Sequence, residues 1–227
     1  MDRYFTSASF DYLDKLAKNN KRDWFQDNKQ TYEDVVRTPA LSFISDMADE
    51  LAFISPHFLA IPKKVGGSLM RVNRDIRFGK DKRPYKTNIG IQFRHERGKD
   101  VHAPGFYVHI EPGECFFGVG IWRPDSPSLG KIRDAIIEKG EHWKAASREK
   151  AFRQIFTPGG EMLKNPPRGY DKEHPLLEDL KRKDYIAIAT TTEKTVCSKQ
   201  FKQQIIDRFQ TASPYMEFLC NALELRY

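Results

Sequence analysis

Three stretches in the middle of the chain alternate between apolar and other side chains with a period of two, and they constrain the fold most strongly. They span residues 89–95, 105–111 and 115–122. This is the period of a β-strand, in which successive side chains face opposite sides. The Pro112-Gly113 pair between the last two stretches suits the central positions of a tight turn. The sequence therefore predicts a β-hairpin within an antiparallel sheet.

Two further stretches, residues 68–77 and 185–192, alternate in the same way and bring the expected sheet to about five strands. Apolar residues at helical spacing predict helices before the first strand and after the fourth. Thr38-Pro39 is expected to begin a new helix, because proline is favoured at the first helical position. The expected fold is α+β, an antiparallel sheet flanked by N-terminal and C-terminal helices. No repeat or linker divides residues 1–227, which indicates a single domain.

Composition excludes several classes of protein. Hydrophobic residues make up 39% of the chain, too many for a disordered protein. No stretch approaches the ~18 to 20 apolar residues that a membrane-spanning helix needs. The three cysteines stand far apart without a CxxC pair, so neither a disulfide framework nor a cysteine zinc site is indicated. The first ten residues lack the apolar region of a secretory signal, and we expect a cytoplasmic protein with no membrane partner.

The net positive charge is concentrated in one segment. The chain carries 38 Lys and Arg against 31 Asp and Glu, a net charge of +7. Residues 63–86 hold nine basic side chains and only two acidic ones, Asp75 and Asp81, so the rest of the chain is balanced. A folded domain presents such a segment as a patch that attracts anions over about one Debye length, ~8 Å in physiological salt. The expected partner is an anionic small molecule or nucleotide, with nucleic acid as an alternative.

The order of residues within this segment favours a site for an anion. If residues 68–77 form a strand, four polar side chains line one of its faces: Arg71, Asn73, Asp75 and Arg77. An aspartate can orient guanidinium groups, which bind phosphate or carboxylate oxygens in pairs. The alternative is an Arg–Asp ion-pair network that only ties the strand to the following loop. Two acids cannot neutralise nine bases, and this favours the anion site.

The expected ligand-binding residues combine this face with the loop that follows, which Gly79 allows to turn closely. They are Arg71, Asn73, Arg74, Asp75, Arg77, Lys80, Lys82, Tyr85 and Lys86. Asp75 and Asp81 are also candidate catalytic residues, because a carboxylate beside the ligand can orient it or accept a proton from it.

The hairpin presents a second candidate surface. In the register that pairs Glu111 with Glu114, one face carries four ring side chains and two glycines: Tyr107, His109, Phe116, Trp122, Gly118 and Gly120. Glycine in a strand often marks the close approach of another group. We expect that group to be a packed helix, and a cleft for a flat ligand ring is the alternative. His109 is expected to be a hydrogen-bonded sheet residue, and in the cleft it is the third catalytic candidate.

Motifs for the common cofactors and catalytic sites do not occur. The six histidines show no HExxH or other metal-ligand spacing. The chain has no GxSxG, GxxxxGK[ST] or strand-linked GxGxxG pattern. The sequence therefore predicts no metal site and no cofactor, and it names no reaction.

Three sequence elements resemble those of a known family. They are Asn19-Asn20 followed by Trp24-Phe25, the Arg-Asp-x-Arg-Phe-x-Lys-Asp-Lys-x-Pro-Tyr-Lys run at 74–86, and Pro-Pro-Arg-Gly-Tyr at 166–170. Over nearly its whole length the chain resembles the uncharacterised family named domain of unknown function 2461. The resemblance supports one domain and implies no activity or cofactor. Gly79 departs from the serine that the family often has, and Arg168 in the last element completes the ligand-binding candidates.

Three functions are compatible with these observations. The favoured one is binding of, or action on, a phosphorylated or other anionic ligand through residues 71–86. The second is nucleic-acid binding by the same patch, with Phe78, Tyr85 or Trp122 stacking on bases. The third is an interaction module for an acidic protein. The interleaving of Asp, Asn and Tyr with the basic residues favours the first, because a surface that follows a phosphate backbone tolerates plain lysines.

Overall fold

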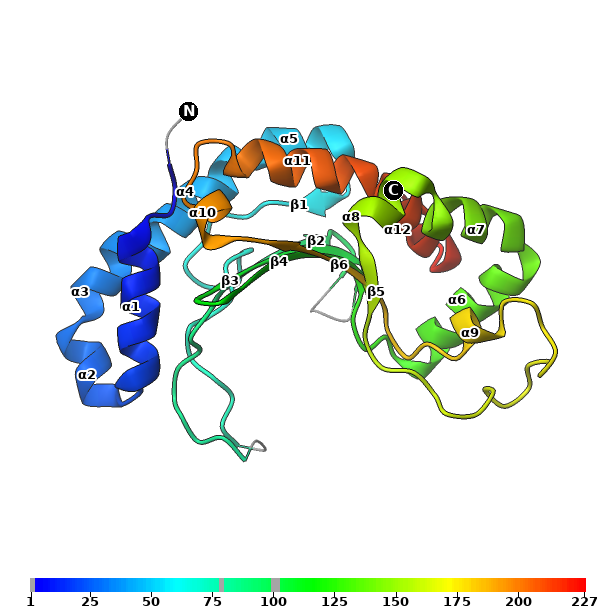
Figure 1. Ribbon diagram of the computed structural model, residues 1–227, viewed down its shortest axis with the longest axis horizontal. Helices are drawn as coiled ribbons and strands as arrows, with labels where there is room; N and C mark the ends of the chain where they lie inside the picture. Colours follow the sequence, from blue (N-terminus) through cyan, green and yellow to red (C-terminus); the bar gives the residue numbers. More distant parts are fainter. Residues whose placement is uncertain (1–2, 78–79, 99–102) are drawn as a thin grey trace.

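A six-stranded antiparallel sheet forms the centre of the protein, in the order β1-β2-β3-β4-β6-β5 (Figure 1). The computed structural model describes residues 3–77, 80–98 and 103–227. The strands are β1 (Phe58–Leu59), β2 (Ile89–His95), β3 (Gly105–Glu111), β4 (Glu114–Ile121), β5 (Thr157–Gly159) and β6 (Tyr185–Thr191). Every pairing between neighbours is antiparallel, which confirms the α+β class.

The β3–β4 hairpin has the register that the sequence predicts. Glu111 pairs with Glu114, His109 with Phe116 and Tyr107 with Gly118. Gly113 has φ +78°, the left-handed conformation that the second central position of a type II turn requires. The Pro-Gly turn therefore fixes which side chains of the two strands share a face.

The expected strand over residues 68–77 is wrong. Its beginning bridges to β2 through Leu69 and Ile91, and a second bridge joins Asn73 to Tyr85. The Arg74 amide donates to the Pro84 carbonyl at 2.9 Å, so the chain leaves the sheet and folds back on itself. The alternating pattern arises in this projecting loop, where Arg71, Asn73, Asp75 and Arg77 are exposed and the residues between them are half-buried.

Helices precede and follow the central strands, as expected. They are α1 (Ser7–Lys18), α2 (Arg22–Asp27), α3 (Lys29–Tyr32), the π-helical η1 (Glu33–Arg37), α4 (Thr38–Asp46), α5 (Ala48–Ile54), α6 (Ser126–Glu138), α7 (Gly140–Arg148), α8 (Lys150–Ile155), α9 (Leu177–Leu180), α10 (Glu193–Val196), α11 (Phe201–Thr211) and α12 (Ser213–Ala222). In the described ranges, none is both long enough and apolar enough to cross a membrane.

The helix α4 begins at Thr38 as expected, with Pro39 in its first turn, but the chain is already helical before it. Arg37 and Thr38 both have right-handed helical backbone angles, so α4 continues from η1. Proline lacks the amide that an α-helix uses and clashes with the carbonyl four residues earlier. The wider π-helical turn directly before Pro39 lies where this conflict arises.

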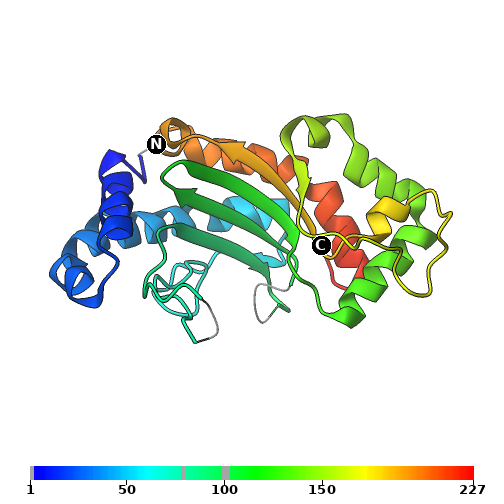
Figure 2. The ribbon, with the colours of Figure 1, turned by 60° about the horizontal axis from the view of Figure 1, so that its bottom comes forward.

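The helices α4, α5 and α11 cover one face of the sheet (Figures 1 and 2). Apolar side chains of the central strands point to this face and are fully buried, among them Phe93, Phe106 and Phe117. Their rings meet helix side chains, as in the 4.5 Å contact between the ring centroids of Phe106 and Phe209. Burying each such side chain contributes roughly 1.5–3 kcal/mol, so this face forms the core.

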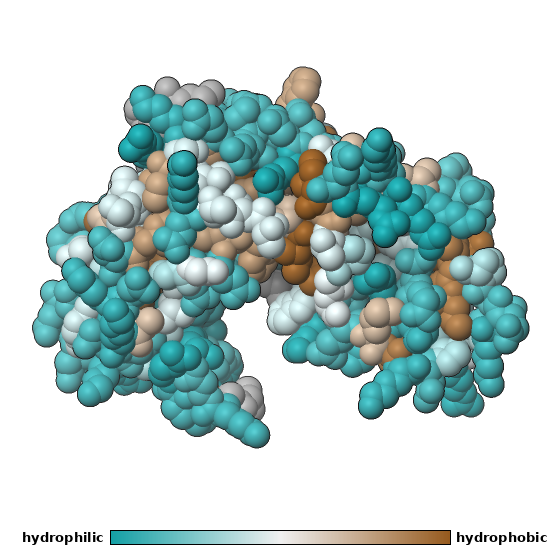
Figure 3. All heavy atoms as spheres, viewed as in Figure 1, coloured by the Kyte–Doolittle hydropathy of each residue, from teal (hydrophilic) through white to brown (hydrophobic). Residues whose placement is uncertain are grey.

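No helix lies over the opposite face of the sheet among the described elements (Figures 1 and 2). The loop that contains residues 71–86 hangs beside it on the side of the N-terminal helices. The α6 and α9 helices, with the loop between β5 and α9, stand on the other side. The space-filling view shows a hollow between these two arms (Figure 3). The open face of the sheet is the floor of this hollow.

Candidate ligand site on the open face

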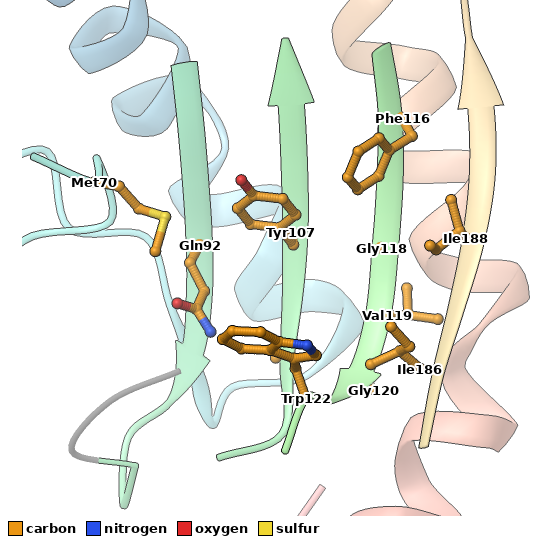
Figure 4. Close-up of a pocket in the computed structure, with 11 residues that line it drawn as sticks. Met70, Gln92, Tyr107, Phe116, Gly118, Val119, Gly120, Trp122, Ile186 and Ile188 are labelled. Atoms are coloured by element: carbon orange, nitrogen blue, oxygen red, sulfur yellow. The ribbon is translucent and has the colours of Figure 1, made fainter. Parts of the chain in front are cut away.

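A cavity of about 310 Å³ lies on the open face of the sheet (Figure 4). The rings of Tyr107, Phe116 and Trp122 stand around it. Its walls are completed by Met70 and Gln92 on the β2 side and by Ile186 and Ile188 on the β6 side. The expected helix over this face is therefore wrong, because the covering helices pack on the apolar side of the strands. The sequence missed Met70 and Gln92, whose positions depend on pairing with β2.

The two glycines in β4 have different roles. At Gly120, φ is +114°, and a Cβ atom would lie 2.0 Å from the Tyr185 carbonyl oxygen. Glycine is thus required at position 120 by the backbone conformation and by the close approach of β6. At Gly118 a Cβ atom would make ordinary contacts of 3.6 and 3.8 Å with Tyr107. The backbone does not require glycine there, and the absence of a side chain leaves room in the cavity.

Trp122 is held at the rim of the cavity by the residues that follow β4. Its side chain is 44% exposed, and the Arg123 guanidinium carbon lies 4.7 Å from the ring centroid. Arg123 has φ +49°, unusual for a residue with a side chain. Its amide donates to the carboxylate of Asp184 at 2.7 Å, and Asp184 is only 2% exposed. A buried carboxylate therefore stabilises the turn that carries Trp122.

Next to the cavity, Tyr107, His109 and Glu111 form a hydrogen-bonded row along β3. His109 Nε2 lies 3.1 Å from a Glu111 oxygen, and His109 Nδ1 lies 3.1 Å from the Tyr107 hydroxyl. An ionised carboxylate only accepts, so Nε2 donates to it, and in the neutral imidazole Nδ1 accepts from Tyr107. Burial raises the pKa of Tyr107 to about 12, so the phenol stays protonated. His109 is thus a hydrogen-bonded sheet residue, and its ring stacks on Phe116.

The same end of the hairpin brings three possible metal ligands together. One ligand atom each from His109, Glu111 and Glu114 lies within 4.8 Å of the others. Glu114 is exposed, and exposed carboxylates gather in this way without an ion. We assign no metal to this group.

We define residues 71–86 as the basic segment. Both of its aspartates, Asp75 and Asp81, form ion pairs with arginines of the same segment. Arg77 donates to the two Asp75 oxygens at 3.0 and 2.7 Å. Arg74 and Arg83 each donate to Asp81 at 2.7 Å. These hydrogen bonds, from Arg77 to Asp75 and chiefly from Arg83 to Asp81, hold the pKa of each carboxyl well below its usual range. The ion-pair network considered from the sequence therefore exists, and both aspartates are poor bases.

Arg71 and Lys86 are outside this network. Within the described part of the chain, neither side chain forms an ion pair with a carboxylate. Lys86 is half-buried, and burial lowers its pKa, with further lowering by Arg71 and Arg74. Positive charge from three side chains is thus gathered at one place, although Arg74 is paired with Asp81 and Arg71 also acts on Asp75.

The remaining candidates in the basic segment point to solvent or are bonded within the segment. Asn73 and Lys80 are exposed. Lys82 is also exposed, and its ammonium donates to the Ile76 carbonyl at 2.9 Å. Phe78 and Gly79 lie outside the described residues.

Tyr85 anchors the basic segment to the N-terminal helices. Its ring is 4% exposed and stacks on Phe25 with 4.1 Å between the ring centroids. The Asn20 side chain donates to the Tyr85 carbonyl and accepts from the Tyr85 amide, both at 3.0 Å. Two of the three sequence elements therefore meet in space, and Tyr85 positions the segment with a ring that is closed to ligands.

Arg168 is not brought together with the basic segment. It is exposed in the loop between β5 and α9, which stands on the opposite side of the open face (Figure 1). The neighbouring Tyr170 donates to Asp134 on α6 at 2.9 Å and fastens this loop to its own arm. A ligand that contacts Arg168 and Arg71 together has to cross the whole hollow.

We expect Asp75 and Asp81 to stay ionised at about pH 3, below the usual carboxyl range. A carboxyl pKa that is lowered by folding adds stability above the unfolded pKa, and this stability is lost as the pH falls through the folded pKa. Carbon NMR of the carboxyl groups measures both titrations. Arg77→Gln should restore ordinary titration to Asp75 and leave Asp81 unchanged. Ordinary titration of both groups in the unchanged protein would disprove the ion pairs.

Comparison with known proteins identifies a family and nothing finer. A family model described as "Conserved hypothetical protein (DUF2461)" matches residues 8–218. No curated protein and no solved structure matches the chain. The match includes all three sequence elements, among them the Asn20 and Tyr85 positions that meet in the fold. The chain belongs to the DUF2461 family.

Proposed function

We propose that the protein binds an organic anion, with a phosphate or carboxylate group held by Arg71 and Lys86. The observation that carries this proposal is the gathering of Arg71, Arg74 and Lys86, where burial and mutual repulsion both act on Lys86. An anion between these groups relieves the repulsion and supplies charge-assisted hydrogen bonds.

The position of the basic segment relative to the cavity supports the same proposal. The segment begins directly after Met70, which lines the cavity and whose amide donates to the Gly90 carbonyl at 2.9 Å. It returns to the sheet after Lys86, whose amide donates to the Val72 carbonyl at 2.7 Å. The segment therefore leaves and rejoins the sheet near β2, beside the cavity, and we propose that one ligand extends from the cavity to both charged groups.

The contacts of the other residues in and around the segment support this proposal. Arg74, Arg77 and Arg83 hold the aspartates and shape the loop. Asn20 and Phe25 hold Tyr85 and fix the base of the segment. Arg71 and Lys86 are left to contact the ligand. We propose binding without a reaction, since the carboxylates of the segment are poor bases.

Anions should raise the thermal stability of the protein through these two residues. A ligand present at a hundredfold excess over its dissociation constant adds about 2.7 kcal/mol to the free energy of unfolding. Thermal-shift measurements with inorganic phosphate, aryl phosphates and sugar phosphates should find such a ligand. The gain should disappear in Arg71→Gln combined with Lys86→Gln.

Lys63→Gln is the matched control, because Lys63 is exposed and lies in the same basic stretch outside the proposed site. This variant should keep the gain in stability. Equal losses in the two variants would indicate a general charge effect, and unchanged melting with every anion would refute the proposal.

A second candidate function is binding of single-stranded nucleic acid. It is favoured by the rings of Tyr107, Phe116 and Trp122, which stand on an open antiparallel sheet beside a basic segment. Bases stack on such rings while basic groups follow the backbone. In this case the logarithm of affinity should fall with the logarithm of salt at about −0.7 per phosphate contact, and Lys63→Gln should flatten the slope. A salt slope that Lys63→Gln leaves unchanged favours the small anion.

A further inference from the structure

The cavity on the open face is lined mainly by apolar and aromatic side chains. Three rings and two isoleucines form most of its walls, and Gln92 contributes an amide (Figure 4). A hydroxyl group moved from water to such walls without a partner loses its hydrogen bonds, at a cost of roughly 1–3 kcal/mol. The body of a sugar phosphate has several such hydroxyls. The cavity therefore suits an apolar group.

Its shape favours a flat ring system. Gly118 contributes no side chain to the floor, and the rings of Tyr107, Phe116 and Trp122 stand around it. A cavity of about 150 Å³ lined by apolar side chains accepts one benzene molecule. The volume of about 310 Å³ on this face is about twice as large. Two fused rings therefore match the space.

The basic segment beside the cavity indicates which group the ligand carries in addition to its ring system. Met70 lies on the cavity wall, and the adjoining residue is Arg71, one of the two cations assigned above to the anion. We propose that the ligand is an amphipathic aromatic anion, with a flat bicyclic body over Gly118 and a phosphate or carboxylate directed to Arg71 and Lys86. This inference rests on the proposed function and adds the chemical class of the ligand.

Calorimetric titration with four compounds tests the aromatic body and the anionic group of the proposed ligand separately. They are 2-naphthyl phosphate, 2-naphthol, inorganic phosphate and glucose 6-phosphate. The naphthyl phosphate should bind at least about tenfold more tightly than each of the others, because it alone fills the cavity and reaches the cations. This preference is the result that the inference requires.

Gly118→Val is the variant that blocks the cavity. The added Cβ meets only ordinary contacts, and valine is favoured in strands, so the sheet should remain folded. This variant should bind 2-naphthyl phosphate no more tightly than inorganic phosphate. Trp122→Ala, at the exposed rim, should also weaken binding of the naphthyl compounds and leave inorganic phosphate unaffected. Arg71→Gln combined with Lys86→Gln should reduce the affinity for 2-naphthyl phosphate to that for 2-naphthol.

The outcomes separate this inference from the proposed function. Equal binding of glucose 6-phosphate and 2-naphthyl phosphate, unaffected by Gly118→Val and Trp122→Ala, would overturn the aromatic body and leave anion binding in place. Binding of 2-naphthol with the same affinity as its phosphate, unaffected by Arg71→Gln, would overturn both.

Discussion

Replacing Gly120 with alanine is expected to lower the free energy of unfolding by about 3 kcal/mol or more, a large part of the 5–15 kcal/mol typical of a domain. The alanine Cβ would lie 2.0 Å from the Tyr185 carbonyl oxygen in the neighbouring strand, so the β4–β6 pairing has to shift. The φ of +114° is also strained for any residue with a side chain. Urea denaturation followed by circular dichroism measures the change.

Gly118→Ala is the control for this prediction. It lies two residues away in the same strand and on the same face, and its Cβ finds ordinary contacts. Alanine restricts the unfolded chain more than glycine does, so this variant should be neutral or more stable by up to about 1 kcal/mol. Similar losses in the two variants would contradict the difference drawn between the glycines.

Asn20→Ala should have the second large effect, on stability and on anion binding together. It removes both hydrogen bonds that hold the Tyr85 backbone and leaves a partly buried amide and carbonyl without these partners. Each loss costs about 1–3 kcal/mol, so we expect about 2–6 kcal/mol in total. The base of the basic segment is then no longer fixed, and the phosphate-dependent gain in melting temperature should shrink.

Asn19→Ala separates this effect from a general effect on α1. Asn19 is exposed, and its side chain donates to the Lys15 carbonyl within its own helix end. Its loss should cost less than about 1 kcal/mol and leave anion binding intact. A larger effect at Asn19 than at Asn20 would show that the Tyr85 contact is unimportant.

Local patterns in the sequence predicted the centre of the fold well. The strands at 89–95 and 105–111 have the expected bounds, and Pro112-Gly113 predicted the hairpin register because turn geometry sets it. Residues 68–77 have the same period, but only their beginning bridges to β2, and residues 72–74 pair with residues 84–86 outside the sheet. Alternation reports only that successive side chains face opposite sides, and it does not identify the partner strand.

The candidate site was predictable in part. The charge of the basic segment and the rings around Gly118 are visible in the sequence. The sequence does not show which arginines the two aspartates bind. Of the expected ligand-binding residues, Arg77 binds Asp75 and Arg74 binds Asp81. The ring of Tyr85 packs on Phe25. The Asn20–Tyr85 contact joins residues 65 positions apart, beyond the reach of any local pattern.

The layer over the core face has a consequence for how the chain is synthesised. That layer combines α4 and α5 from the first quarter of the chain with α11 from the last, and Phe43 and Phe201 meet there with 5.4 Å between ring centroids. At about 5–20 residues per second, ribosomes need on the order of ten seconds to extend the chain from β4 to α11. During that interval β2, β3 and β4 can pair, but their apolar face is only half covered. We therefore expect the nascent chain to depend on chaperones until Phe201 and Phe209 emerge.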